Sequence, residues 1–269
     1  VPETFNTKII VRSGDPLENT DLEMVGYNNA RSIIILPPET EEMHDLFIIK
    51  VALAIINNPG RKKEKFNIVA EIRDEKTLEV LDLIGRDEIS VLQLSEVMAR
   101  LTVQVVHQPG LSVVIEDLLR FEGDEIYFSH IPQVSGREFR DAQLMFEDST
   151  VIGVQVKNGE TKLNPPMDYV LQPEDKIIAI SEDDDTVVAN GHPDKAARDE
   201  KITVSARSGH KPVHTVILGY STRMKMIIQE LANYFPVGST LQLFVQEHYI
   251  DKTKGLTTDH LNISINSGE

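Results

Sequence analysis

Clustered carboxylates are the residues of this chain that most clearly suggest chemistry. Two of them, Glu71 and Asp74, flank the end of a predicted parallel strand, and Asp141 precedes Asp148 by about two helical turns. Ca²⁺ prefers oxygen ligands, and open α/β sheets bind ligands at the carboxyl ends of their strands. We therefore predict a cation site with four candidate ligands: Glu71, Asp74, Asp141 and Asp148. The alternatives are a structural ion pair with Arg73 for the first pair and a solvated helix end for the second.

The densest acidic run is Glu182-Asp183-Asp184-Asp185. It opens a stretch that is poor in apolar residues, which favours weak attraction of cations rather than a tight site. The chain contains no EF-hand loop, no cysteine and no paired histidine spacing of the HExxH kind. Thiolate sites and disulfides are therefore excluded.

A glycine turn after the strand predicted at 214–219 is the second candidate site. Dinucleotide sites need G-x-G-x-x-G here, because the glycines let the backbone approach the pyrophosphate and let the helix pack closely. Only Gly219 is present, and Ser221 and Met224 place side chains where the other glycines are needed. We predict that NAD does not bind in its usual pose. As cofactor-binding candidates, Gly219, Ser221 and Arg223 could still meet an anion at the helix N-terminus, or the turn serves folding alone.

Other classes of function are disfavoured by composition and motifs. The formal net charge of −16 argues against nucleic-acid binding, which needs basic faces. Neither Ser13 nor Ser267 lies in a G-x-S-x-G elbow, and no acid–base constellation is evident, so we predict that the chain is not an enzyme. No apolar run approaches the roughly 20 residues of a spanning helix, so we expect this chain to be soluble.

The spacing of apolar residues predicts an α/β protein. Strands are expected at 7–12, 32–36, 66–72 and 89–94, and helices at 41–56 and 76–84, with a short capped helix from Thr20-Asp21-Leu22-Glu23 to about Gly26. The alternation indicates a parallel sheet with right-handed crossovers. Because residues 32–36 are apolar at successive positions, we expect that strand to be buried on both faces.

Four segments are expected along the chain. Residues 1–122 form a partial Rossmann-like lobe that ends in two crossover helices around Pro109-Gly110, and 123–188 form a small α+β lobe with a hairpin at Asn158-Gly159. Residues 189–212 are a linker, and 213–269 begin a second Rossmann-like unit. The two crossover helices carry more apolar surface than one sheet face needs, which favours a contact between subunits or ordinary core packing.

A short internal repeat relates the two ends of the chain. Residues 9–15 read IIVRSGD and residues 263–269 read ISINSGE, each an apolar strand followed by a Ser-Gly-acid turn. A repeat of this period indicates that the sequence begins inside one α/β unit and stops inside the next. Strands missing from the first sheet are of the kind present in the last segment, so one chain could complete another's sheet, or its own.

The order of these elements resembles that of RCK domains, which regulate potassium conductance. The stretch Asn164-Pro165-Pro166 to Leu171, followed by Glu174-Asp175 and Lys176-Ile177-Ile178, looks like a TrkA-C lobe. The degenerate glycine turn and the run VRSGDP over residues 11–16 are similar to the CASTOR/POLLUX family of ion channels. The resemblance covers nearly the whole chain and lies in the order of elements rather than in one motif.

The resemblance implies a cytosolic gating-ring region at the cytoplasmic face of a membrane. In the full-length relatives a transmembrane pore domain precedes this region in the sequence. Relatives pair their RCK units and assemble four subunits into a ring, which binds a regulatory ligand, commonly Ca²⁺, and acts on the pore. Two alternatives stay open at this point. One is an NAD(P)-dependent Rossmann oxidoreductase, and the other is a stand-alone regulatory subunit of a potassium transporter.

Overall fold

The computed structural model describes residues 7–38, 43–85, 87–191, 211–258 and 261–268. They divide into two compact units. Unit 1 combines residues 1–103 with 212–269, and unit 2 comprises residues 104–211. The linker predicted at 189–212 falls largely outside the described residues. Within the described part of the chain, every helix is too short or too polar to cross a membrane.

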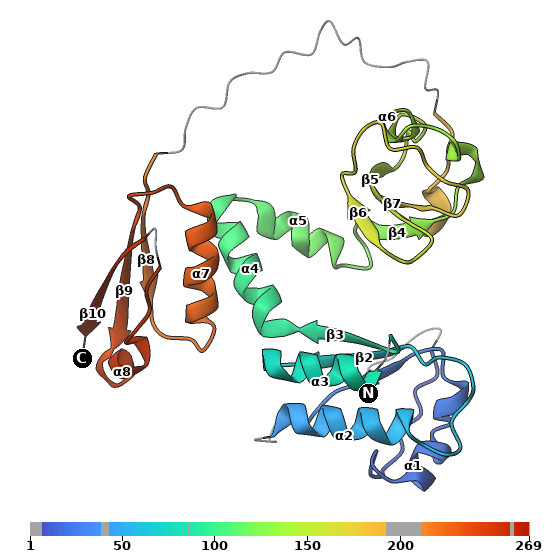
Figure 1. The fold of residues 1–269 in the computed structure, drawn as a ribbon, viewed down its shortest axis with the longest axis horizontal. Helices are drawn as coiled ribbons and strands as arrows, with labels where there is room; N and C mark the ends of the chain where they lie inside the picture. The colour runs from blue at the N-terminus through green and yellow to red at the C-terminus, as the bar shows by residue number, and fades with distance from the viewer. Residues whose placement is uncertain (1–6, 39–42, 86, 192–210, 259–260, 269) are drawn as a thin grey trace, which may run out of the picture. The chain divides into compact units, whose positions relative to one another are not determined.

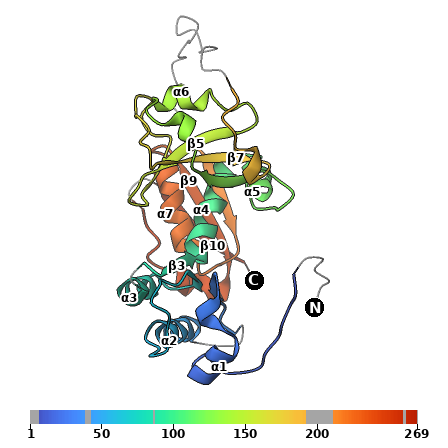
Figure 2. The same cartoon turned by 90° about the vertical axis from the view of Figure 1, so that its right-hand side faces the viewer.

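The first sheet of unit 1 is parallel and has the strand order β1 (Ile33–Ile35), β2 (Ile68–Ile72), β3 (Ile89–Gln93). Figure 1 labels β2 and β3 of this sheet. Two helices, α2 (His44–Ile56) and α3 (Glu75–Gly85), connect the strands and pack side by side on one face (Figure 2). Ile35 is buried in this core, whereas Ile34 is 67% exposed. The prediction of burial on both faces is therefore wrong for β1, because among the described residues helices cover only one face.

The segment before this sheet differs from its prediction. Residues 7–13 form no strand, and Ile9, Ile10 and Val11 are exposed. A strand needs a neighbouring strand to satisfy its backbone groups, and none of the described segments supplies one here. The repeated segment at the other end, β10 (Asn262–Gly268), is a strand because β9 (Thr240–Gln246) lies beside it.

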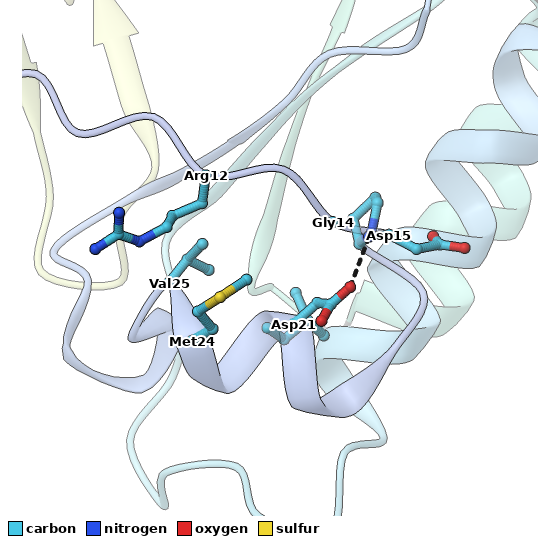
Figure 3. A pocket seen from close by; sticks show the side chains of 8 residues that line it. Arg12, Gly14, Asp15, Asp21, Met24 and Val25 are labelled. Atoms are coloured by element: carbon cyan, nitrogen blue, oxygen red, sulfur yellow. Dashed lines mark hydrogen bonds between the residues drawn. The ribbon is translucent and has the colours of Figure 1, made fainter.

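The predicted capping box at Thr20 is also absent. Helix α1 (Asn19–Met24) begins directly after Glu18, without a side-chain cap, so Thr20 already lies inside its first turn. Instead, the Asp15 N–H donates to Asp21 Oδ2 over 2.8 Å (Figure 3). A side chain at Gly14 would lie 2.7 Å from the same oxygen, which explains the glycine. The helix ends as predicted, at a left-handed Gly26, and the short 3-10 helix η1 (Tyr27–Asn29) follows.

A second parallel sheet in unit 1 confirms the predicted start of another Rossmann-like unit. Its strand order is β10, β9, β8 (His214–Leu218). Helix α7 (Met224–Tyr234) joins β8 to β9, and η6 (Glu247–Tyr249) with α8 (Ile250–Thr253) joins β9 to β10. The two sheets are separate among the described residues, so the prediction that the chain completes its own sheet is wrong for this part of it.

The two crossover helices are α4 (Leu94–His107) and α5 (Leu111–Leu118), and a left-handed Gly110 separates them. Val103 of α4 is fully buried with the residues of α7 that cover the second sheet. In α5 no residue is buried, and Val113 and Val114 are exposed. The intersubunit contact suggested for these helices stays a prediction.

Unit 2 is an α+β lobe built on an antiparallel sheet. The strand order is β4 (Glu125–Ser129), β7 (Lys176–Ser181), β5 (Thr150–Gln155), β6 (Thr161–Leu163). Helix α6 (Phe139–Gln143) lies against this sheet (Figure 2), and Phe139 is buried in the core. The hairpin at Asn158-Gly159 is confirmed by the pairing of β5 with β6 and by a left-handed Gly159. Two 3-10 helices, η2 (Pro132–Val134) and η3 (Asp184–Thr186), complete the lobe.

Candidate functional site

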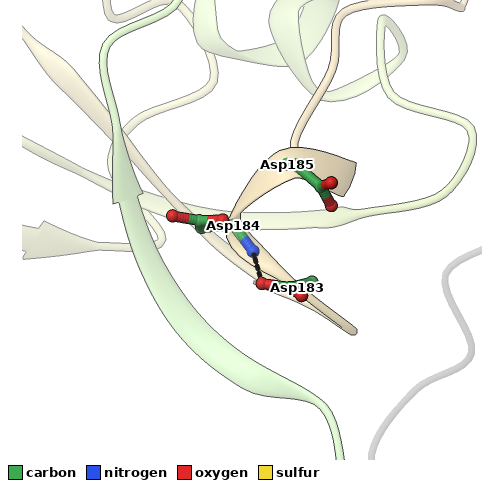
Figure 4. A group of neighbouring side chains, drawn as sticks. All are labelled: Asp183, Asp184 and Asp185. Carbon is green, nitrogen blue, oxygen red and sulfur yellow. Dashed lines mark hydrogen bonds between the residues drawn. The ribbon is translucent and has the colours of Figure 1, made fainter. Parts of the chain in front are cut away.

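Three consecutive aspartates in unit 2 form the tightest carboxylate group among the described residues (Figure 4). One ligand atom from each of Asp183, Asp184 and Asp185 lies within 4.8 Å of the others. The arrangement follows from η3, which Asp183 caps by accepting the Asp184 N–H over 2.7 Å. Thr186 closes the turn by accepting the Asp183 N–H through its hydroxyl. A folded turn therefore holds this acidic run, which the sequence suggested belonged to a flexible stretch.

A cavity of about 440 Å³ adjoins this turn, and we call it the acidic pocket. It is lined by five carboxylates and four other residues: Glu122, Glu125, Glu182, Asp183, Asp185, Phe121, Gly123, Tyr127 and Thr186. The carboxylates come from β4, from the loop before it and from the residues after β7. Strand β4 pairs with β7 from Glu125 to Ser181, and this pairing brings the two acidic segments together.

Tyr127 lies among the carboxylates of the acidic pocket. Its hydroxyl donates to Glu125 Oε2 over 2.6 Å. This hydrogen bond, then burial, then the negative charges of Glu125, Asp183 and Asp184 raise the pKa of Tyr127 to about 12. Negative charges that oppose ionisation of a phenol also attract a cation.

The donor set of the acidic pocket fits a hard divalent cation. Ca²⁺ takes six to eight oxygen ligands, and carboxylates suit Ca²⁺ or Mg²⁺ better than the metals that prefer thiolate or imidazole. No histidine is among the lining residues, and the chain has no cysteine. Water and the carboxylates of the lining could supply the required number of oxygens.

The structure places the four ligands predicted from the sequence in two different units. In unit 2, Asp141 lies in α6, and Asp148 accepts the side-chain N–H of Asn190 over 2.9 Å. Neither lines the acidic pocket. In unit 1, Glu71 lies half-buried in β2, and Asp74 follows that strand. Their role as metal ligands stays a prediction.

Asp74 takes part in capping α3. Its Oδ1 accepts the Lys76 N–H over 3.1 Å, and its own N–H donates to Asp45 Oδ2 over 2.8 Å. Asp45 also accepts the Arg73 N–H over 3.0 Å and the Thr77 hydroxyl over 2.8 Å. Among the described residues Arg73 makes no ion pair with Glu71 or Asp74, and its backbone N–H instead contributes to this cluster.

Asp45 is the residue of this cluster that sequence reasoning missed. Burial acts to raise its pKa, but the hydrogen bonds from the backbone of Asp74 and Arg73, and from Thr77 and His44, outweigh burial and lower it. A carboxylate that accepts several N–H groups at a helix start satisfies donors that the helix itself leaves free. Asp45 therefore ties α2 to the start of α3, at the sheet edge where a ligand site was expected.

The glycine turn after β8 has the left-handed conformation that its glycine permits, with φ of +91° at Gly219. The Ser221 hydroxyl accepts the Arg223 N–H over 3.3 Å, so it is engaged within the turn. The next residue along from the glycine, Tyr220, stacks on Tyr249 with ring centroids 4.7 Å apart. Lys252 lies over both rings. The side chains around the turn thus contact one another.

The space beside this turn is small. A cavity of about 160 Å³ is lined by Ile217, Leu218, Gly219, Tyr220, Ser221, Met224 and Ile227. Ligand pockets usually measure about 300–1,000 Å³. The geometry gives no support to a dinucleotide here, and anion binding by Gly219, Ser221 and Arg223 stays a prediction.

Comparison with known proteins gives a consistent result. Residues 95–196 match the family described as Castor and Pollux, part of voltage-gated ion channel. The chain is 32% identical over 265 residues to the probable ion channel POLLUX of Arabidopsis thaliana, which covers 97% of this chain and 32% of that protein. It is also 32% identical over 263 residues to the probable ion channel CASTOR of Oryza sativa subsp. japonica, covering 96% of this chain and 29% of that protein.

The fold agrees with this relationship. The structure of the human SLO3 gating ring is similar with a TM-score of 0.65 and 15% identity, over 95% of this chain and 55% of that one. The similarity confirms the predicted fold class, in which Rossmann-like sheets accompany an α+β lobe. The chain spans about a third of the length of the curated relatives described above. The chain therefore belongs to the family of the CASTOR and POLLUX ion channels, and its fold is that of the human SLO3 gating ring.

Proposed function

We propose that this chain is the cytosolic ligand-sensing region of a cation channel, that it binds a regulatory cation such as Ca²⁺, and that it couples this binding to the pore of the same channel. The relatives are named ion channels, and the similar solved structure is a gating ring. A region of this kind acts by binding and changing shape, so we infer no catalytic role. A tetrameric ring built from paired RCK units, at the cytoplasmic face of a membrane, is part of the same proposal.

The acidic pocket is the observation that carries the choice of ligand. Five carboxylates line one cavity, and two of them, Glu125 and Asp183, contribute to the raised pKa of Tyr127, after the Glu125 hydrogen bond and burial. A cation bound among them would remove electrostatic repulsion between β4 and the turn after β7. The pocket thereby links cation binding to the conformation of unit 2, which a ring that senses a ligand requires.

Calorimetric titration of the purified chain with Ca²⁺, and separately with Mg²⁺, tests the proposal. We expect saturable Ca²⁺ binding that is lost in the double variant Asp183→Asn/Asp185→Asn. The matched control is Asp141→Asn/Asp148→Asn, which removes the same charge from the same unit outside the pocket. Loss of Ca²⁺ binding in the control alone would show that Asp141 and Asp148, which were predicted from the sequence, are the ligands, and that the acidic pocket is not the site. Absence of Ca²⁺ binding in the unmodified chain would refute cation sensing by this region.

Coupling is tested by the shape of the chain in solution. We expect Ca²⁺ to change the small-angle scattering curve of the unmodified chain and to leave that of the Asp183→Asn/Asp185→Asn variant unchanged. A bound cation also stabilises the folded state by mass action, by about 2.7 kcal/mol at one hundred times its dissociation constant. Binding without any change in scattering would contradict the coupling while leaving the site itself intact.

A further inference from the structure

Three buried or half-buried hydroxyl groups meet behind the acidic turn of unit 2. Ser181 ends β7, Thr186 ends η3, and Ser149 lies directly before β5. The Oγ of Ser181, a residue that is 1% exposed, lies 2.6 Å from Thr186 Oγ1 and 2.9 Å from Ser149 Oγ. We call these three residues the hydroxyl cluster. It joins the turn after β7 to the segment before β5.

Each hydroxyl of the cluster carries one proton, and the acceptors around it account for all three. The Ser149 hydroxyl donates to the Thr186 carbonyl over 3.0 Å, and the Thr186 hydroxyl donates to the Asp183 carbonyl over 2.6 Å. Only the Ser181 proton remains, and it has two acceptors within reach, Thr186 Oγ1 and Ser149 Oγ. The cluster therefore has two arrangements of its protons, and in both every hydroxyl has a hydrogen-bond partner.

Thr186 connects the hydroxyl cluster to the aspartates of the acidic pocket. Its Oγ1 accepts the Asp183 N–H over 3.1 Å, and its own N–H donates to the Asp183 carbonyl over 3.2 Å. These bonds close the turn in which the Asp183 carboxylate accepts the Asp184 N–H. The direction of the Asp183 carboxylate thus depends on a side chain that carries no charge.

The chain after Thr186 runs along the loop between α6 and β5. The Gly191 N–H donates to the Met145 carbonyl over 2.7 Å, and the Asn190 side chain accepts the Glu147 N–H over 3.1 Å. A side chain at Gly191 would lie 2.8 Å from the Met145 carbonyl carbon, so the two segments are in close contact. Through Thr186 the hydroxyl cluster continues this contact into η3.

We propose that the hydroxyl cluster positions the aspartates of the acidic pocket and transmits the occupancy of that pocket to the loop at 144–149. This role rests on the proposed binding of a cation in the pocket. A cation that draws the aspartates together changes the η3 turn, and with it the contact between Thr186 and Ser181. The Ser181 proton then passes from one acceptor to the other, which changes the contact with Ser149. A ligand selects between two arrangements in this way when it interacts differently with each.

Removal of the Thr186 hydroxyl tests the positioning. Thr186→Val keeps the shape of the side chain and removes only its hydrogen bonds. Loss of a group that orients metal ligands typically weakens metal binding, so we expect the Ca²⁺ affinity of Thr186→Val to fall by about 10–100-fold in calorimetry. Thr186→Ser restores the hydroxyl and should bind like the unmodified chain. Thr150→Val is the matched control, because Thr150 is exposed on β5.

Removal of the Ser149 hydroxyl tests the transmission. Ser149 does not line the acidic pocket, so we expect Ser149→Ala to retain Ca²⁺ binding. In NMR spectra of the unmodified chain, Ca²⁺ should shift the amide signals of Glu147 and Gly191 as well as those of the pocket. In Ser149→Ala the pocket signals should still shift, whereas those of Glu147 and Gly191 should stay in place.

Three outcomes would overturn this role and leave the cation site itself intact. They are unchanged Ca²⁺ affinity in Thr186→Val, a loss of affinity that Thr186→Ser does not restore, and shifts at Glu147 and Gly191 that persist in Ser149→Ala. An unmodified chain that binds no Ca²⁺ would instead refute the proposed function, and this role with it. Circular dichroism and thermal melting show whether each variant is folded. Ser181→Ala, which removes the donor to Thr186 and adds no bulk, is the second variant and should also weaken Ca²⁺ binding; unchanged binding would count against the cluster.

Discussion

Replacing Asp45 by alanine should destabilise unit 1. The Asp45 side chain is 15% exposed and accepts hydrogen bonds from two backbone N–H groups and the Thr77 hydroxyl. Loss of a helix cap costs about 0.5–2 kcal/mol, and loss of a hydrogen bond to a charged group about 1.5–3 kcal/mol. Because these terms overlap, we expect Asp45→Ala to lower the free energy of unfolding by about 2–4 kcal/mol, and Asp45→Asn by about 1 kcal/mol.

The pH dependence of this effect has a definite sign. Hydrogen bonding lowers the pKa of Asp45 in the folded state. Its stabilising contribution is therefore fully present above the unfolded pKa of about 3.9 and is lost as the pH falls through the lower folded value. The difference in stability between the unmodified chain and Asp45→Asn should accordingly shrink as the pH falls below about 4.

Urea unfolding and amide hydrogen exchange measure this prediction. Exchange at the N–H groups of Arg73 and Asp74 should accelerate in Asp45→Ala, because they lose their acceptor. Asp82→Ala is the control, since Asp82 is an exposed acid on the same helix α3. A loss below about 0.5 kcal/mol for Asp45→Ala, or exchange no faster than in the control, would refute the capping role.

Three other substitutions test packing in unit 1 by urea unfolding. Glu88→Gln should cost about 1–3 kcal/mol and reduce the loss of stability at acid pH. Burial acts to raise the pKa of Glu88, but the hydrogen bonds from the Phe66 N–H and from Arg61 outweigh burial and lower it; an unchanged loss of stability at acid pH would contradict this. Tyr27→Phe should be neutral or stabilising by up to about 1 kcal/mol, because the buried hydroxyl has no partner among the described residues; a clear loss would reveal one. Gly14→Ala should cost about 0.5–1.5 kcal/mol, because the Asp21 carboxylate must move and its hydrogen bond from the Asp15 N–H is weakened; an unaltered midpoint would contradict the contact.

Most of the fold could be predicted from the spacing of apolar residues, because helices and strands impose different periods on them. The predicted strand at 66–72 corresponds to β2, and the predicted helix at 76–84 corresponds to α3. The strand at 7–12 failed because a strand depends on its neighbour as well as on its own sequence. Burial of 32–36 on both faces failed for the same reason, since coverage depends on distant segments.

The candidate site was predicted only in part. The acidic run at 182–185 was recognisable, but the sequence predicted only weak attraction of cations there. The neighbouring residues did not indicate that η3 would hold the aspartates in a folded turn. Glu125 and Tyr127 face this turn only through the antiparallel pairing of β4 with β7, which brings residues more than fifty positions apart together. Asp45 was overlooked because its partners lie in the loop before α3, almost thirty residues away.

The phenol of Tyr127 gives the acidic pocket an optical signal of its own. The chain contains no tryptophan and six tyrosines, so tyrosine dominates its near-ultraviolet absorbance and its intrinsic fluorescence. A cation that takes the Glu125 carboxylate removes the acceptor of the Tyr127 hydroxyl, and its pKa then falls from about 12 toward the ordinary value of about 10. A spectrophotometric alkaline titration, with Tyr127→Phe as the blank, would therefore report occupancy of the pocket without any added dye.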